Sequence, residues 1–199
     1  MRVLVFSKVN GFVHVDALPV VRQTVAALGA ERGWAVADSD NGGSITAETL
    51  ANVDVVVWNN VSGDVLTQGQ RAALRDYVEG GGGFVAVHGS GGDPAYFWDW
   101  YPDSLLGARF IGHPNDPQFQ EARLVATDRA HPVMAGVAAE WRMVDEWYSF
   151  AESPRSAGVN VLVTIDETTY DARTATQDLK MGDHPLVWTS CAGNGRVIY

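Results

Sequence analysis

The stretch Phe84-Val85-Ala86-Val87-His88-Gly89-Ser90-Gly91-Gly92 joins a short apolar run to a glycine-rich turn. A continuous apolar run of this length is typical of a strand that is covered on both faces of a parallel sheet. The four glycines at 80–83, just before it, are expected to end a helix. We therefore predict a buried strand over 84–87 whose carboxyl end delivers His88 into a turn.

Three similar strand signals precede this stretch, and they alternate with helix signals. The predicted strands cover residues 3–6, 34–37, 53–58 and 84–87. Asp16 is expected to cap a helix that has Pro19 in its first turn and that Gly29 and Gly33 close. Thr46 begins a short helical turn. Thr67 and Gln70 form a T-x-x-Q capping box ahead of a helical stripe over 73–78.

This alternation predicts an α/β fold with a parallel sheet and helices on both faces. In such sheets, ligands bind beyond the carboxyl ends of the strands. Three polar segments should therefore meet at one edge, namely 7–14, 58–60 and 88–90. The residues that we expect to bind substrate there are Ser7, His14, Trp58, Asn59 and Ser90.

The second half of the chain is less regular. Strands are predicted over 122–127, 160–165 and 185–189, and a short helical stretch ends over 105–110. The long connections are rich in Pro, Gly and Asp, so we interpret this half as an irregular cap with added strands. Without a linker or a repeat, residues 1–199 form a single predicted domain. The chain stops inside the strand-like segment Arg196-Val197-Ile198-Tyr199, so we expect a truncated C-terminus.

The composition limits the partners. A formal net charge of −10 argues against nucleic acid, because such a surface repels phosphates. No apolar run is long enough to span a bilayer, and residues 1–7 lack a signal-peptide pattern, so the expected location is cytoplasmic. The seven Trp and six Tyr residues either fill the core or line a site for a small-molecule sugar.

Histidines are the main candidates for chemistry. We expect His88 to face the cleft beside free backbone N–H groups, or else to cap its strand. His113 and His184 each precede a proline that stiffens the backbone, which suits either a site or an ordinary turn. His14 follows the first strand, whereas His131 is interpreted as structural.

The densest acidic segment is Asp145-Glu146-Trp147-Tyr148. In an extended chain, Glu146 and Tyr148 share a face and Asp145 points the other way. Aromatic walls should raise the pKa of Glu146, as a general acid or base requires. The alternative is a solvated acidic loop.

A divalent metal such as zinc would need ligands that only the fold brings together, because no H-E-x-x-H spacing is present. The candidate ligands are His88, His113, His184 and Glu146. Nucleotide binding is disfavoured because neither glycine-rich segment fits a phosphate-binding loop.

An ordered set of motifs across nearly the whole chain resembles the trehalose-utilisation (ThuA-like) family. The motifs are Phe6-Ser7-Lys8, Gly11-Phe12-Val13-His14, Gly81 to His88, Trp100-Tyr101, Leu105 to Ala108, Gly112-His113-Pro114, His131-Pro132, Asp145 to Tyr148, Met181 to Pro185 and Gly195-Arg196-Val197.

The resemblance implies a flavodoxin-like, class I glutamine amidotransferase-like fold, in which a mostly parallel sheet lies in a three-layer sandwich. It also implies a link to trehalose and related disaccharides, through keto-sugars, and metal binding in some members. The wider superfamily carries a nucleophilic cysteine where this chain has His88, so glutamine hydrolysis is not expected. Family members usually continue beyond the Gly-Arg-Val strand, which this chain does not.

The leading hypothesis is an enzyme acting on a sugar or keto-sugar by hydrolysis, isomerisation or elimination, with or without a metal. His88, His113 and His184 would bind or polarise the substrate, Glu146 would be the acid or base, and Asp145 would orient the loop. Trp58, Trp98 and Tyr148 would stack on the sugar. The alternatives are a non-catalytic sugar-binding module and an amidotransferase-like hydrolase using Ser90. Exposed aromatics and a sheet edge near Tyr199 would also allow a homodimer.

Overall fold

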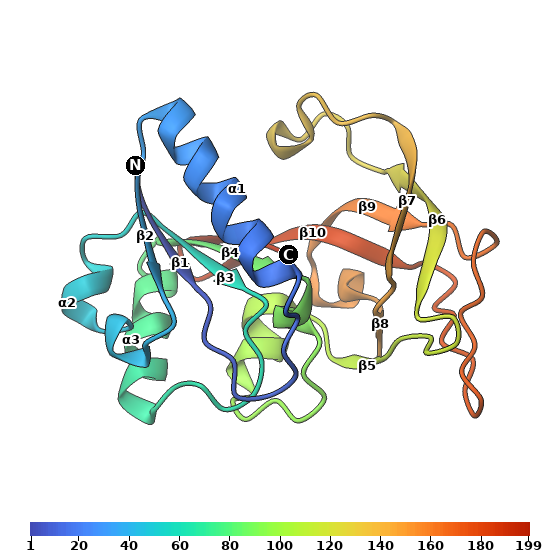
Figure 1. Ribbon diagram of the computed structural model, residues 1–199, viewed down its shortest axis with the longest axis horizontal. Coiled ribbons are helices and arrows are strands. Elements are labelled where there is room, and N and C mark those ends of the chain that lie inside the picture. Colours follow the sequence, from blue (N-terminus) through green and yellow to red (C-terminus); the bar gives the residue numbers. More distant parts are fainter.

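The structure is a computed structural model that describes residues 1–199. A nine-stranded mixed sheet takes strands from both halves of the chain (Figure 1). Its strand order is β2-β1-β3-β4-β11-β10-β9-β6-β7. The first five strands in this order are parallel, and the remaining ones join antiparallel. The strands of this sheet are β1 (Arg2–Phe6), β2 (Ala35–Ser39), β3 (Val55–Asn59), β4 (Gly83–Val87), β6 (Phe119–Ala126), β7 (Glu140–Glu146), β9 (Asn160–Ile165), β10 (Pro185–Ala192) and β11 (Gly195–Ile198).

Helices cover both faces of the parallel part, as the alternating pattern predicts. Side chains at odd positions of β1, such as Val3 and Val5, pack with Val21 and Val25 of α1. Even positions of β1 pack on the opposite face in the largest apolar cluster, which includes residues of α2, α3 and η3. None of the helices is both long and apolar enough to cross a membrane. The helices and helical turns are α1 (Ala17–Arg32), α2 (Ala47–Leu50), α3 (Gln68–Glu79), η1 (Gly42–Ser44), η2 (His88–Gly91), η3 (Tyr101–Leu106), η4 (Pro132–Met134) and η5 (Pro154–Ala157).

The ends of the two long helices follow from local sequence. Thr67 and Gln70 make the reciprocal capping box that begins α3, so that prediction is confirmed. Gly33 ends α1 with a left-handed φ of 67°, a conformation that glycine adopts without strain. Asp16 occupies the cap position of α1, but its side chain makes no capping hydrogen bond, so its predicted role is wrong.

The cap holds elements that the sequence pattern did not predict. Strands β5 (Phe110–Gly112) and β8 (Ser149–Phe150) form a separate two-stranded sheet. β7 was also missed, because only its last residue, Glu146, is buried and its side chains therefore lack a clean alternation. These three strands matter because they bring residues 110–113 and 146–150 to the carboxyl ends of the parallel strands.

The C-terminal strand lies inside the sheet rather than at its edge. β11 pairs with β4 on one side and with β10 on the other. Tyr199 exchanges two backbone hydrogen bonds with Trp188 of β10. The expected sheet edge near Tyr199 is therefore wrong, and it gives no support to self-association.

Candidate functional site

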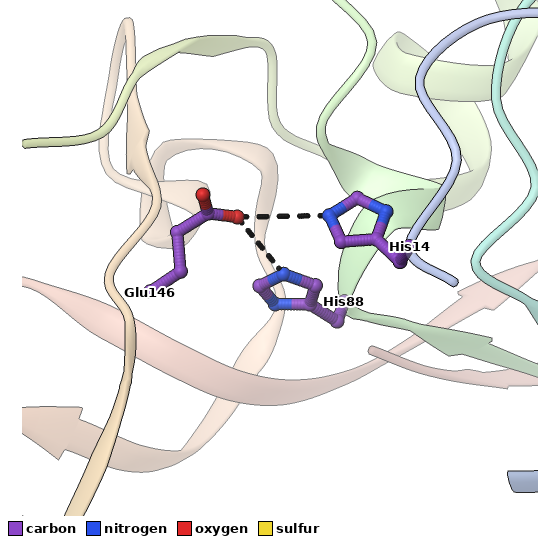
Figure 2. Close-up of side chains that lie close together, drawn as sticks. All are labelled: His14, His88 and Glu146. Carbon is purple, nitrogen blue, oxygen red and sulfur yellow. Dashed lines mark hydrogen bonds and ion pairs between the residues drawn. The ribbon is translucent and has the colours of Figure 1, made fainter. Parts of the chain in front are cut away.

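Three histidines from distant segments converge on the carboxylate of Glu146. Figure 2 shows two of them, His14 and His88, beside Glu146. His14 comes from the loop after β1, His88 from the turn after β4, and His113 from the segment after β5. The Nε2 atoms of His14 and His88 lie 3.6 and 3.2 Å from Oε2 of Glu146. The Nε2 of His113 lies 3.3 Å from the other oxygen, Oε1. We call these four residues the histidine–glutamate cluster.

His88 sits in a backbone conformation that is unfavourable for it. Its φ is 40°, in the left-handed region that non-glycine residues rarely adopt. The Tyr199 hydroxyl donates a hydrogen bond to the carbonyl of His88 at 3.0 Å, and the ring of Tyr148 stacks on the imidazole with 4.3 Å between centroids. These two contacts hold the turn so that the imidazole points at Glu146.

Glu146 ends β7 and is only 5% exposed. Burial alone would raise its pKa, but the nearby imidazoles of His14 and His88, the amide of Gln118 and the charge of His113 lower that pKa far below its usual range. The predicted raised pKa is therefore wrong, because the site surrounds the carboxylate with nitrogen donors as well as aromatic rings. The arrangement favours an ionised carboxylate over a general acid.

Tyr148 lies on the same side as Glu146, as the extended spacing predicts. Its hydroxyl is 3.0 Å from Nε2 of His14. Burial and the nearby charge of Glu146 raise the pKa of Tyr148 well above its usual value, so the phenol keeps its proton. Tyr148 therefore contributes a hydroxyl donor to the wall of the cluster.

His113 is oriented as a ligand for a metal would be. Its Nδ1 lies 2.9 Å from the carbonyl oxygen of Pro114, which can only accept, so Nδ1 carries the proton in the neutral ring. The bare Nε2 then faces an oxygen of Glu146. Two acceptors in contact require a proton or a cation between them. Donation from the second nitrogen to a carbonyl is also the usual arrangement behind a metal-binding histidine.

The donor set suits a divalent cation. One ligand atom each from His14, His88 and Glu146 lies within 4.8 Å of the others. Donors at about 2.0–2.2 Å around a tetrahedral zinc ion lie roughly 3.3–3.6 Å apart, close to the separations in the cluster. Imidazole with carboxylate also suits other first-row metals.

His14 lacks the partner at its second ring nitrogen that His113 has. Its Nδ1 is buried and has no hydrogen-bond partner. A neutral imidazole that bound a cation through Nε2 would carry its proton on Nδ1, without an acceptor there. A Cβ added at Gly89 would lie 2.6 Å from this Nδ1, so the glycine leaves room for the ring.

His184, predicted as a catalytic residue and metal ligand, lies outside the cluster. It is 1% exposed, and both ring nitrogens have protein partners. Nε2 is 2.8 Å from the carbonyl oxygen of Tyr148, and Nδ1 is 2.9 Å from a carboxylate oxygen of Glu167. Neither nitrogen is free for a ligand, so the geometry makes His184 a support for the backbone at Tyr148.

Several residues expected to bind substrate are buried in the scaffold beneath the cluster. Ser7 and Asn59 hydrogen-bond each other at 3.0 Å, and Asn59 also donates to the carbonyl of Leu18. Trp58 is 4% exposed and stacks on Phe6. Ser7 and Leu18 flank the loop that carries His14, so the Asn59 contacts fix that loop. The burial of Trp58 leaves none of its surface for a sugar at the cluster.

Ser90 and Trp98 line a cavity that lies apart from the cluster and that Trp58 also borders. The Ser90 hydroxyl donates to the carbonyl of Trp58 at 2.6 Å and accepts from the amide of Val61. The amide of Gly89, expected to be free for an oxygen, instead donates to Oδ1 of Asn60. Oδ1 of Asp145 accepts from the amide of Glu146, and Asp145 borders a pocket together with His88 and Glu146.

Sequence reasoning missed three contributors to the site. Gln118 donates from its amide to Oε1 of Glu146. Asn60 and Tyr199 fix the turn at His88 and Gly89. Of these three, only Asn60 lies in a segment, 58–60, that the sequence predicts to be part of the site.

Comparisons with known proteins agree with this fold. A ThuA-like protein from Bacteroides uniformis matches with a TM-score of 0.84 and 25% identity over 100% of this chain and 80% of that chain. A ThuA-like protein from Parabacteroides merdae matches with a TM-score of 0.69 and 18% identity over 99% and 77% of the two chains. A cytoplasmic protein from Salmonella typhimurium shares the fold with a TM-score of 0.58 and 11% identity over 99% and 85%.

No curated protein matches the sequence. The family model described as "Trehalose utilisation" covers residues 2–199, which is nearly every element described above. The motifs quoted from the sequence therefore indicated the right family, and the chain belongs to the ThuA family.

Proposed function

We propose that this protein is an enzyme that acts on a sugar or keto-sugar and that uses a divalent cation held by the histidine–glutamate cluster. One observation carries the proposal: three imidazole Nε2 atoms face the two oxygens of one buried carboxylate. Assembling these groups from three loops, with His88 in an unfavourable backbone conformation, is costly for stability. Such strain is concentrated at functional sites.

His88 and Glu146, with His14 or His113, would hold the cation, which when bound would act as a Lewis acid on a carbonyl or hydroxyl oxygen of the sugar. The ionised Glu146 balances its charge. Gln118 and the carbonyl of Pro114 orient the Glu146 carboxylate and the His113 ring. Tyr148 keeps its proton and offers its hydroxyl to a substrate oxygen beside His14.

The sugar is proposed from the family to which the chain belongs and from the chemistry of the cluster. The family is described by trehalose utilisation. A bound cation that polarised a sugar oxygen, at a ketone or beside one, would assist hydrolysis, isomerisation or elimination. We also assign the fold to the flavodoxin-like, class I glutamine amidotransferase-like type. The parallel order β2-β1-β3-β4-β11 supports this assignment, because it reproduces the flavodoxin order with β11 as the fifth strand.

The surroundings of Ser90 disfavour glutamine hydrolysis. A serine nucleophile needs a partnered base, and the hydroxyl of Ser90 is instead buried between Trp58 and Val61. The remaining rival is a sugar-binding module without turnover.

Turnover of a keto derivative of trehalose by the protein loaded with zinc or manganese separates these two functions. The Tyr148→Phe and His88→Ala variants should lose turnover by at least tenfold, while Tyr148→Phe retains sugar binding. His131→Asn is the matched control, since His131 lies away from the cluster and caps η4. Binding without turnover in the wild-type protein with either metal would establish the module and reject the enzyme.

A further inference from the structure

A polar groove of about 740 Å³ adjoins the histidine–glutamate cluster. One wall is β5 with the segment that follows it, including His113, and the other is the connection between β9 and β10 over residues 171–179. In Figure 1 this connection is the orange-red excursion beside β6. The volume lies within the range of about 300–1,000 Å³ that small-molecule sites occupy.

The groove offers neutral hydrogen-bonding groups above an apolar floor. The exposed side chains of Asn115, Thr176 and Gln177 line it and make no hydrogen bonds within the protein. Its base includes Phe110 and Leu179. Amides and hydroxyls around an apolar floor match a sugar ring, which presents hydroxyls at its rim and C–H groups on its face.

The charges in the groove disfavour an anionic ligand. The guanidinium of Arg173 donates to Asp171 at 2.6 and 2.8 Å, so its charge is balanced by a neighbouring carboxylate. Asp116, on the opposite wall, has no cationic partner. A neutral sugar is therefore favoured over a sugar phosphate.

The second wall is anchored at both ends. Gln120 of β6 accepts from the backbone amide of Asp171 and donates to its carbonyl. The carbonyl of Leu179 accepts from the hydroxyl of Ser149 in β8. The wall is thus fixed to β6 and β8, beside the strand that ends in Glu146. A fixed wall is consistent with a groove formed before the ligand binds.

His113 contributes both to the groove and to the histidine–glutamate cluster. Its side chain lines the groove, and its Nε2 is 3.3 Å from Glu146. We infer that the groove binds the second, non-reacting ring of a neutral disaccharide whose reacting ring lies at the histidine–glutamate cluster. This inference rests on the proposed function and adds a binding subsite made by Asn115, Thr176 and Gln177.

The test compares trehalose with glucose by calorimetry, using the protein with and without added zinc. Wild type should bind trehalose about tenfold more tightly, which corresponds to about 1.4 kcal/mol. The double variant Asn115→Ala with Gln177→Ala should reduce that preference to about twofold and leave glucose binding unchanged. The matched control removes one Asn and one Gln amide from exposed positions elsewhere, through Asn194→Ala with Gln23→Ala, and should keep the preference.

Equal affinities for the two sugars in the wild-type protein would overturn the inference, and so would a preference that survives in the double variant. Failure of the proposed function has a different signature. In that case no cation binds and no turnover occurs, while the trehalose preference still depends on Asn115 and Gln177.

Discussion

Nε2 of His88 lies 3.2 Å from Oε2 of Glu146, although 58 positions separate the two residues in the sequence. The contact joins the end of a central parallel strand to the end of β7, a strand of the cap. It exists because β6, β7 and β9 extend the sheet and carry Glu146 back over the carboxyl ends of the parallel strands. The candidate chemistry therefore depends on the contact between the parallel half and the cap.

Glu146→Gln should weaken cation binding at least a hundredfold, which corresponds to about 2.7 kcal/mol. The substitution keeps the shape of the side chain but removes the charge that the three histidines face. Competition with a chromophoric chelator measures the affinity. Glu31→Gln, on the exposed surface of α1, is the control and should bind as wild type does. An unchanged affinity in Glu146→Gln would remove the carboxylate from the site.

His184→Ala should destabilise the fold by about 2–5 kcal/mol and leave cation stoichiometry unchanged in the folded protein. The substitution leaves a cavity and removes the partner of Glu167 and of the Tyr148 carbonyl, all of them largely buried. Urea unfolding gives the stability, and elemental analysis gives the metal content. Loss of the cation with wild-type stability would instead make His184 a ligand.

His88→Gly should be more stable than His88→Ala by about 1 kcal/mol, because the left-handed backbone at this position costs any residue with a Cβ. Both variants remove the imidazole, so their difference reports the backbone alone. Thermal unfolding of the two cation-free proteins measures it. Greater stability of the alanine variant would show that the turn is not strained.

Acid should remove a stabilising contribution from Asp166. Hydrogen bonds from the hydroxyl and amide of Thr168 and from Arg123 hold the pKa of Asp166 at about 2, below its ordinary value of 3.8. A lowered pKa in the folded state stabilises the protein above about pH 4, and this contribution disappears as the pH falls through about 2. Asp166→Asn should therefore be less stable than wild type at pH 7, and the difference in the free energy of unfolding should become smaller by pH 3.

Urea midpoints at several pH values measure this effect. Asp40→Asn, at an exposed position, serves as the control and should show no such convergence. A gap that stays constant down to pH 2 would mean that Asp166 is not held ionised by these partners.

The parallel half could be predicted from sequence because its signals are local. Buried parallel strands form continuous apolar runs, and helices carry caps such as Thr67 with Gln70. The cap could not be predicted in the same way. β7 is mostly exposed and lacks alternation, and β5 and β8 are only three and two residues long.

The candidate site was predicted in part for the same reason. His88, His14 and Asn59 follow predicted strands, so their convergence at one edge could be expected. Whether such a residue faces the cleft or the core depends on packing that the sequence does not display, which is why Asn59 and Trp58 are buried. The same limit applies to His184, whose motif resembles that of His113 but whose ring points into the cap.

The most direct measurement is anomalous diffraction at the zinc edge from crystals of the zinc-loaded protein. We predict one peak within about 2.0–2.2 Å of Nε2 of His88 and of a carboxylate oxygen of Glu146. Nε2 of His14 or of His113 should complete the coordination. An occupied zinc elsewhere on the molecule, or no peak at the cluster at saturating zinc, would contradict the account.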